Sequence, residues 1–200
     1  MSIDSLLDAL QAMSVWEVVA VLLGIAYLLL VVRESLWCWY AAFGSTAIFL
    51  YIFWDVGLVM ESGLQVYYLA MAVYGWWQWQ HGSGEAGELE ITRWNPTRHV
   101  LAIGLVLSAA AISGLLLAKY TGAALPFLDS FTTWGSILTT WMVARKVLEN
   151  WLYWLVIDSV SIYLYLDRGL YLTALLFMVY LVIVVFGYRK WLHHYRMQSS

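Results

Sequence analysis

Two stretches decide the fold: RESLWCWYAAFGSTAIFLYIFWDVG, residues 33–57, and RKVLENWLYWLVIDSVSIYLYLDRG, residues 145–169. Each begins with Arg, continues through a mainly apolar run, and ends in Asp, one further residue and Gly. An α-helix needs about 20 mainly apolar residues to cross a bilayer, and each stretch supplies such a run. The two stretches therefore predict helices that span a membrane.

The composition of the whole chain agrees with this prediction. Hydrophobic residues make up 63% of the 200 positions and charged residues 12%, against roughly 45–50% and about 25% in soluble domains. One soluble core could not bury that much apolar surface, so lipid must be the solvent for most of the chain. The sequence has no basic patch interleaved with aromatic residues, so we expect no nucleic-acid partner. Because Cys38 is the single cysteine, an intramolecular disulfide and a cysteine metal cage are excluded.

Apolar runs on either side of these stretches predict seven spans in one membrane domain covering residues 1–200. Residues 1–12 have apolar residues at helical spacing and predict a short interfacial helix, and residues 81–99 form the longest polar loop. The predicted spans are 14–32, 36–54, 64–80, 100–118, 127–144, 150–166 and 170–188.

The basic residues predict the orientation, because Lys and Arg accumulate on the cytoplasmic side of a membrane protein. With seven spans, a cytoplasmic C-terminus leaves only Lys119 and Arg168 outside. The loop 81–99 is then cytoplasmic and the N-terminus is outside. The basic residues placed inside are Arg33, Arg93, Arg98, Arg145, Lys146, Arg189, Lys190 and Arg196.

The chain also repeats itself. Shifted by 112 residues, residues 33–79 match residues 145–191 without a gap. The matched pairs include residue types that are uncommon in membrane spans: Arg33/Arg145, Trp39/Trp151, Tyr51/Tyr163, Asp55/Asp167, Gly57/Gly169, Gly75/Gly187 and Trp79/Trp191. Four spans separate the copies, so both copies face the same way. We expect a first three-helix repeat over 14–80, a linking helix over 100–118, and a second three-helix repeat over 127–191. Parallel repeats of this kind occur in transporters, with the site where the repeats meet.

Polar residues inside the sixth predicted span indicate a binding site. Asn150, Trp154, Asp158, Ser161 and Tyr165 recur every three or four residues and share one helix face. Inserting an aspartate at the centre of a membrane-spanning helix costs about 2.5–3.5 kcal/mol on insertion scales. We therefore expect Asp158 to have a structural or functional role. Either it pairs with a hydroxyl or an Arg of a neighbouring helix, or it faces a cavity and accepts a polar or cationic solute.

Other spans add aromatic, amide and hydroxyl groups. Such a set suits a flat heteroaromatic ring joined to a hydroxylated or charged part. Hydroxyls such as Thr139 could instead join helices, and Trp residues near span ends, Trp151 and Trp154 included, could belong to the interfacial belt. No nucleophile–base pair, metal cluster or cofactor motif indicates an enzyme. The further candidates are Gln65, Tyr68, Trp76, Trp151, Thr139, Tyr180 and Tyr188.

The run ENWLYW, then Asp158, Ser161 and YLY, followed by GLYLTALL, Tyr180 and the Gly187–Trp191 segment, resembles the PnuC family of bacterial vitamin transporters. RESLWCWYAAFG and LQVYYLAMAVYGWWQW (residues 64–79) resemble the same family. The resemblance covers residues 17–80 and 134–191. It implies an all-α membrane fold of seven helices in a 3+1+3 arrangement, similar to a full-length version of the SWEET sugar transporters.

The resemblance also implies a function. Members are carriers of the bacterial inner membrane that move nicotinamide riboside by facilitated diffusion, and a cytoplasmic kinase traps the solute by phosphorylation. It implies solute contacts at Asn150, Trp151, Trp154, Gln65, Tyr68 and Trp76, and it is compatible with a homotrimer. Thiamine and riboflavin carriers of the same family are alternatives, and so is a membrane protein that binds a ligand without moving it.

Overall fold

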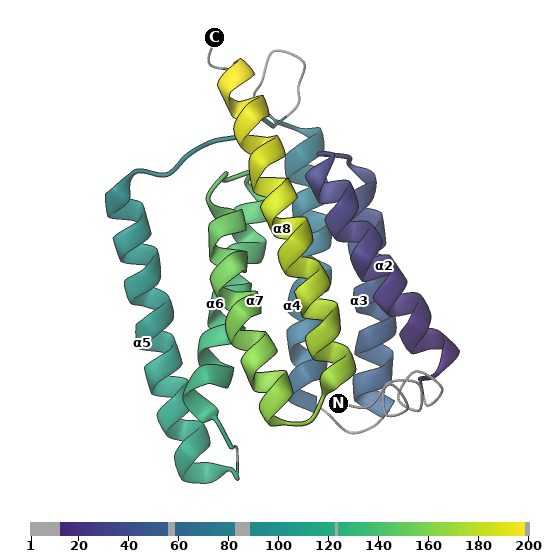
Figure 1. Ribbon diagram of the computed structural model, residues 1–200, viewed down its shortest axis with the longest axis vertical. Helices are drawn as coiled ribbons and strands as arrows, with labels where there is room; N and C mark the ends of the chain where they lie inside the picture. Colours follow the sequence, from purple (N-terminus) through teal and green to yellow (C-terminus); the bar gives the residue numbers. More distant parts are fainter. Residues whose placement is uncertain (1–12, 56–58, 83–88, 123, 199–200) are drawn as a thin grey trace. The chain divides into compact units, whose positions relative to one another are not determined.

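Helices make up most of the part of the chain that the structure describes. The computed structural model describes residues 13–55, 59–82, 89–122 and 124–198. The predicted interfacial helix over 1–12 lies outside these residues, and so does part of the 81–99 loop. Figure 1 shows the helices, which are α2 (Val15–Val32), α3 (Trp37–Asp55), α4 (Val59–Gln80), α5 (Pro96–Tyr120), α6 (Pro126–Ala144), α7 (Asn150–Asp167) and α8 (Tyr171–Gln198).

The helix boundaries match the predicted spans except where a helix continues past the apolar run. α8 extends to Gln198 although its span was predicted to end at 188, and α4 begins at Val59 and not at 64. No Pro or Gly interrupts the polar end of α8, so its backbone hydrogen bonds continue beyond the apolar part. α5 begins earlier than predicted because Asn95 caps it, accepting a 2.9 Å hydrogen bond from the Arg98 N–H, with Pro96 in the first turn.

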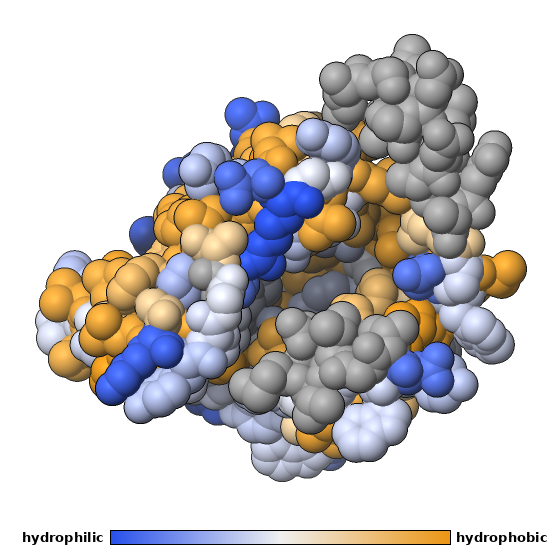
Figure 2. Space-filling view, turned by 90° about the horizontal axis from the view of Figure 1, so that it is seen from below, coloured by the Kyte–Doolittle hydropathy of each residue, from blue (hydrophilic) through white to orange (hydrophobic). Residues whose placement is uncertain are grey.

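Four of these helices, α2, α3, α5 and α8, are long and apolar enough to cross a membrane by length and composition alone. Hydrophobic residues cover much of the described surface in the view along the helices (Figure 2). α4, α6 and α7 are less apolar because they carry polar residues such as Gln65, Thr139 and Asp158. The predicted candidate residues thus concentrate on the three helices that depart most from a lipid-facing composition.

The chain divides into two compact units. The first comprises Met1–Glu90 with Arg196–Ser200 and holds α2, α3 and α4. The second, Ile91–Tyr195, holds α5, α6, α7 and α8 up to Tyr195.

A tryptophan on the middle helix organises the first unit. Trp39 of α3 is buried and lies over Gly75 of α4, where any Cβ would overlap the indole ring. The Trp39 ring meets Trp79 edge-on, with ring centroids 5.4 Å apart and an interplanar angle of 85°. It also contacts Tyr27 of α2, with centroids 6.1 Å apart. One indole therefore joins all three helices of this unit.

The second unit repeats this arrangement with the residues 112 positions further on. Trp151 of α7 lies over Gly187 of α8, where a Cβ would come within 2.5 Å of the ring. Trp151 meets Trp191 edge-on, with centroids 5.4 Å apart and an angle of 88°. The internal repeat seen in the sequence is thus a repeat of packing geometry as well.

The turns that lead into α3 and α7 are also alike. Glu34 has φ 54° and Lys146 has φ 47°, the left-handed conformation that non-glycine residues seldom adopt. The following N–H reaches back to the carbonyl five residues earlier, over 3.0 Å in the first turn and 2.9 Å in the second. This Schellman-type ending satisfies the last carbonyls of α2 and α6.

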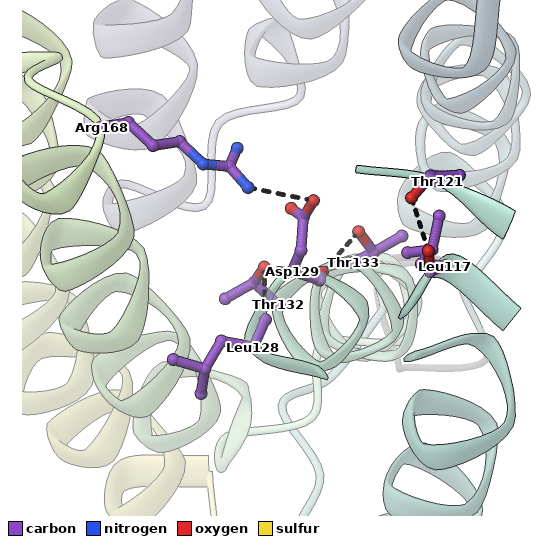
Figure 3. Close-up of polar contacts among 7 residues, drawn as sticks. All are labelled: Leu117, Thr121, Leu128, Asp129, Thr132, Thr133 and Arg168. Carbon is purple, nitrogen blue, oxygen red and sulfur yellow. Dashed lines mark hydrogen bonds and ion pairs between the residues drawn. The ribbon is translucent and has the colours of Figure 1, made fainter. Parts of the chain in front are cut away.

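α5 joins the second unit through α6. Gly114 of α5 lies so close to Phe127 that a Cβ would come within 2.5 Å of its ring, and Trp134 Nε1 donates a 3.1 Å hydrogen bond to Ser113 Oγ. At this end of α6, Arg168 Nη2 forms a 3.2 Å ion pair with Asp129 Oδ2 (Figure 3). The pair connects the start of α6 to the segment between α7 and α8.

We predict that Gly187→Ala destabilises the protein, because the added methyl group meets the Trp151 ring in a packed helix interface. Overpacking of this kind costs about 1–3 kcal/mol. Gly104→Ala on α5 is the matched control, since nothing lies within 4 Å of a Cβ there. Thermal unfolding in detergent should show a lower midpoint for Gly187→Ala and an unchanged or raised one for Gly104→Ala. Equal midpoints for the two variants would contradict the packing argument.

Candidate functional site

The start of α7 holds a buried amide that is only partly hydrogen-bonded. Asn150 is 0% exposed, and its Nδ2 donates a 2.6 Å hydrogen bond to the Val147 carbonyl. Its Oδ1 is buried and has no hydrogen-bond partner among the described residues. A buried amide oxygen without a partner costs about 1–3 kcal/mol. Asn150 Oδ1 could therefore accept a hydrogen bond from a solute or from water.

Asp158 lies two turns along the same helix and is also buried. It is 3% exposed, and within the described ranges no hydrogen bond or ion pair to its carboxylate is found. Tyr165 and Tyr180 lie close enough to interact electrostatically with Asp158. The pairing with a neighbouring Arg or hydroxyl, one of the two explanations that the sequence left open, is thus not observed there.

An aromatic cluster accompanies this carboxylate. The Tyr165 and Phe177 ring centroids are 5.0 Å apart, and those of Phe177 and Tyr180 are 5.3 Å apart. Ring faces attract cations, by about 0.5–2 kcal/mol depending on how well water is excluded. A buried carboxylate that interacts with Tyr165 and Tyr180, two rings of this cluster, is an arrangement that suits a cationic, ring-shaped solute.

The remaining candidates of the second unit lie in different surroundings. Trp154 and Tyr188 are half-buried. Thr139 is buried, and its hydroxyl donates a 2.8 Å hydrogen bond to the Gly135 carbonyl in its own helix. Gly135 itself packs against Ile157 of α7. A solute contact at Thr139 stays a prediction, and its hydroxyl already has one partner.

Trp151 has a clear packing role. It is 1% exposed and fills the space over Gly187, as Trp39 does over Gly75 in the first unit. Burial this deep does not fit the interfacial belt, which was one reading of its position. The Nε1 atoms of Trp39 and Trp151 are both buried without a hydrogen-bond partner in the described part of the chain. The shared geometry gives Trp151 a structural function, whether or not it also contacts a solute.

The first unit contributes an aromatic groove of about 450 Å³ between α3 and α4. Trp76 lines it, and its Nε1 is buried with no partner among the described residues. Gln65 and Tyr68 are half-buried on the same helix, nearer its start. The groove is lined by Trp39, Tyr40, Phe43, Ala72, Val73 and Trp76.

Sequence reasoning missed the contacts around Glu149, the residue before Asn150. Glu149 Oε1 accepts a 2.8 Å hydrogen bond from Arg93 Nε in an ion pair, and Oε2 accepts a 3.2 Å bond from the Trp94 N–H. The hydrogen bond to Glu149 raises the pKa of the Arg93 guanidinium. The only signal in the sequence is an acid placed directly at the start of a span, and nothing in the sequence identifies its partner 56 residues earlier.

A second polar contact lies one turn further along α7. The His99 Nδ1 and Tyr153 hydroxyl are 2.9 Å apart, and the two rings stack with centroids 5.8 Å apart. His99 thus joins α5 to α7. Among the described residues no group of three or more His, Cys, Asp or Glu is arranged as metal ligands would be.

Comparison with known proteins places this geometry in a family. The family described as nicotinamide mononucleotide transporter matches residues 14–193, nearly the whole chain. The chain belongs to this family. It is therefore a multi-pass membrane protein of a transporter family and not an enzyme, and the expected resemblance to PnuC proteins is confirmed.

Relatives within the nicotinamide mononucleotide transporter family have different named solutes. The riboflavin/roseoflavin transporter RibM of Streptomyces davaonensis is 28% identical over 183 residues, covering 88% of this chain and 84% of RibM. The nicotinamide riboside transporter PnuC of Escherichia coli K12 is 27% identical over 210 residues, covering 92% of this chain and 87% of PnuC. A crystal structure of the vitamin B3 transporter PnuC shares the fold, with a TM-score of 0.75 at 20% identity over 98% of this chain and 88% of that one. The predicted all-α membrane fold is confirmed.

We predict that Asn150→Ala weakens solute binding at least tenfold, about 1.4 kcal/mol, because it removes the buried acceptor. The matched control on the same helix is Ser159→Ala, since Ser159 is exposed and its hydroxyl donates to the Leu155 carbonyl. Isothermal titration of the purified variants gives the dissociation constants. Unchanged affinity in a well-folded Asn150→Ala protein would place the site elsewhere.

Proposed function

We propose that this protein is a carrier of nicotinamide riboside that works by facilitated diffusion. The observation that carries the proposal is a pair of buried acceptors on α7, Asn150 Oδ1 and the Asp158 carboxylate, in a member of a transporter family; neither has a hydrogen-bond partner among the described residues. Polar groups at membrane depth are costly and usually mark a solute pathway. The named activity of the PnuC relatives supports this choice of solute.

The chemistry of the solute matches these groups. Nicotinamide riboside has a cationic pyridinium ring, a carboxamide and a hydroxylated ribose. The ring fits beside Asp158 and the cluster of Tyr165, Phe177 and Tyr180. The ribose hydroxyls can donate to Asn150 Oδ1. Gln65, Tyr68, Trp76, Trp154 and Tyr188 are further candidate contacts, by resemblance to the family.

Thiamine is the nearest alternative because its thiazolium ring is also cationic. Riboflavin is a second alternative, supported by the similarity to RibM. Riboflavin is neutral, so it gains nothing from an ionised Asp158. The acid on α7 therefore favours nicotinamide riboside or thiamine over riboflavin.

We further propose the setting in which the carrier works. It would lie in the bacterial inner membrane with its N-terminus outside and its C-terminus in the cytoplasm, following the distribution of basic residues. The repeats over 14–80 and 127–191, linked by the helix at 100–118, would open the site to each side in turn. A cytoplasmic kinase would trap the solute by phosphorylation without contacting the carrier, and a homotrimer is compatible with the family.

We predict that liposomes containing only this protein take up nicotinamide riboside until the concentrations inside and outside are equal. No ion-coupling cluster of acids accompanies Asp158 in the predicted spans, so no gradient should drive accumulation. Labelled solute should exchange in counterflow, which separates a carrier from a protein that binds without transporting. Accumulation driven by a proton or sodium gradient would contradict uncoupled transport, and saturable binding without exchange would favour the binding-protein alternative.

We predict that Asp158→Asn changes solute preference, because it removes the negative charge and keeps the shape of the side chain. Dissociation constants for nicotinamide riboside and thiamine should rise at least tenfold, and the constant for riboflavin should rise much less or fall. Ser159→Ala is again the control. An equal loss for charged and neutral solutes would show that Asp158 does not recognise a cation.

A further inference from the structure

Residues 91–95, which precede α5, form a strap across the turn between α6 and α7. The Thr92 N–H donates a 3.0 Å hydrogen bond to the Lys146 carbonyl, and the Leu148 N–H donates a 2.8 Å bond to the Thr92 carbonyl. Ile91 and Val147 are buried here. Two backbone hydrogen bonds and buried side chains thus fix the strap to the residues directly before α7.

The side chains of the strap strengthen this attachment at Glu149. The Arg93 guanidinium and the Trp94 N–H together occupy both carboxylate oxygens of Glu149, which is only 6% exposed. The Arg93 side chain is 51% exposed, so the cost of losing it falls on the buried Glu149 carboxylate, whose charge would be left with fewer partners. Glu149 is adjacent to Asn150 in the chain, so these bonds fix the backbone from which the Asn150 side chain extends.

Among the described residues of the other repeat, the equivalent turn has the same backbone conformation but no such backbone bridge. The residue equivalent to Glu149 is Trp37, which is 68% exposed, and the residue equivalent to Asn150 is Cys38. Within the described residues no backbone bridge like that of Thr92 reaches the turn at Glu34. The strap therefore occurs in the repeat that contains Asn150. The turn geometry is the same in both repeats, so this geometry alone does not require a strap.

We propose that the strap holds the start of α7 in place for solute binding, with Arg93 and Glu149 as positioning residues for Asn150. Neither residue needs to contact the solute. The left-handed Lys146 precedes α7 by only a few residues, and in that turn a small backbone rotation would redirect the amide. The strap limits that rotation and keeps Asn150 Oδ1 aimed at the site. This inference rests on the proposed function of Asn150 as a solute acceptor.

The test is a double-mutant cycle on nicotinamide riboside binding, measured by isothermal titration with thermal unfolding of each variant in parallel. Arg93→Ala should raise the dissociation constant at least fivefold in the unmodified protein. In an Asn150→Ala background the same change should have an effect below twofold, because the amide it positions is gone. Arg93→Lys, which keeps the charge beside Glu149, should stay closer to the unmodified protein than Arg93→Ala does.

Arg168→Ala is the matched control. It removes an ion pair of the same second unit whose acid, Asp129, is more exposed than Glu149 and lies at the other end of α6 and α7. It should leave the dissociation constant within twofold.

Two results would overturn the positioning role: an unchanged dissociation constant in Arg93→Ala, or an equal loss with and without the Asn150 amide. The second result would mean that the ion pair only stabilises the fold. If the unmodified protein does not bind nicotinamide riboside, the proposed solute is wrong, but this result does not contradict the positioning role of the strap. The same cycle then tests the strap with whichever of thiamine and riboflavin binds.

Discussion

The absence of water inside a lipid bilayer constrains this protein more than any other factor. A polar group there must find a partner within the chain, and most do: Ser45 donates to the Ala20 carbonyl, Thr139 to Gly135 and Ser159 to Leu155. Among the described residues of α7, the buried Asn150 Oδ1, Asp158 carboxylate and Trp151 Nε1 have no hydrogen-bond partner, and only the Trp151 indole has an evident packing role, over Gly187. A solute or water that supplies the missing partner to Asn150 and Asp158 would offset the cost of burying them, which is the basis of the proposed site.

The two repeats share their packing and differ in the polar residues of their middle helices. Both repeats place a tryptophan over a glycine and against a second tryptophan with nearly the same angles, because the three-helix packing depends on that contact. The two buried acceptors of α7 do not repeat. Cys38 and Thr46 occupy the positions equivalent to Asn150 and Asp158. The proposed solute acceptors of α7 thus belong to the second half alone, and the groove beside Trp76 belongs to the first half.

The fold could be predicted from the sequence because its signals are local or periodic. Apolar runs give the helices, the 112-residue repeat gives matching halves, and the stripe through Asn150 and Asp158 gives a helix face. The contacts of Glu149 could not be predicted, since an ion pair between residues 56 positions apart follows no period. Burial of Trp151 was also undecided, because a tryptophan near a span end suits both an interface and a core. The ends of α8 and α4 were misplaced because helices continue beyond apolar runs.

The central claim is that water and solute reach the buried polar face of α7. Thiol labelling at Ser161 tests it most directly, since Ser161 lies one turn from Asp158 on that face and is buried. In a Cys38→Ser background, Ser161→Cys should react with a water-soluble thiol reagent, and nicotinamide riboside should slow the reaction. Ser159→Cys, on the exposed face of the same helix, should show no such protection. A Ser161→Cys protein that does not react, or that reacts equally fast with solute present, would contradict a solute cavity at α7.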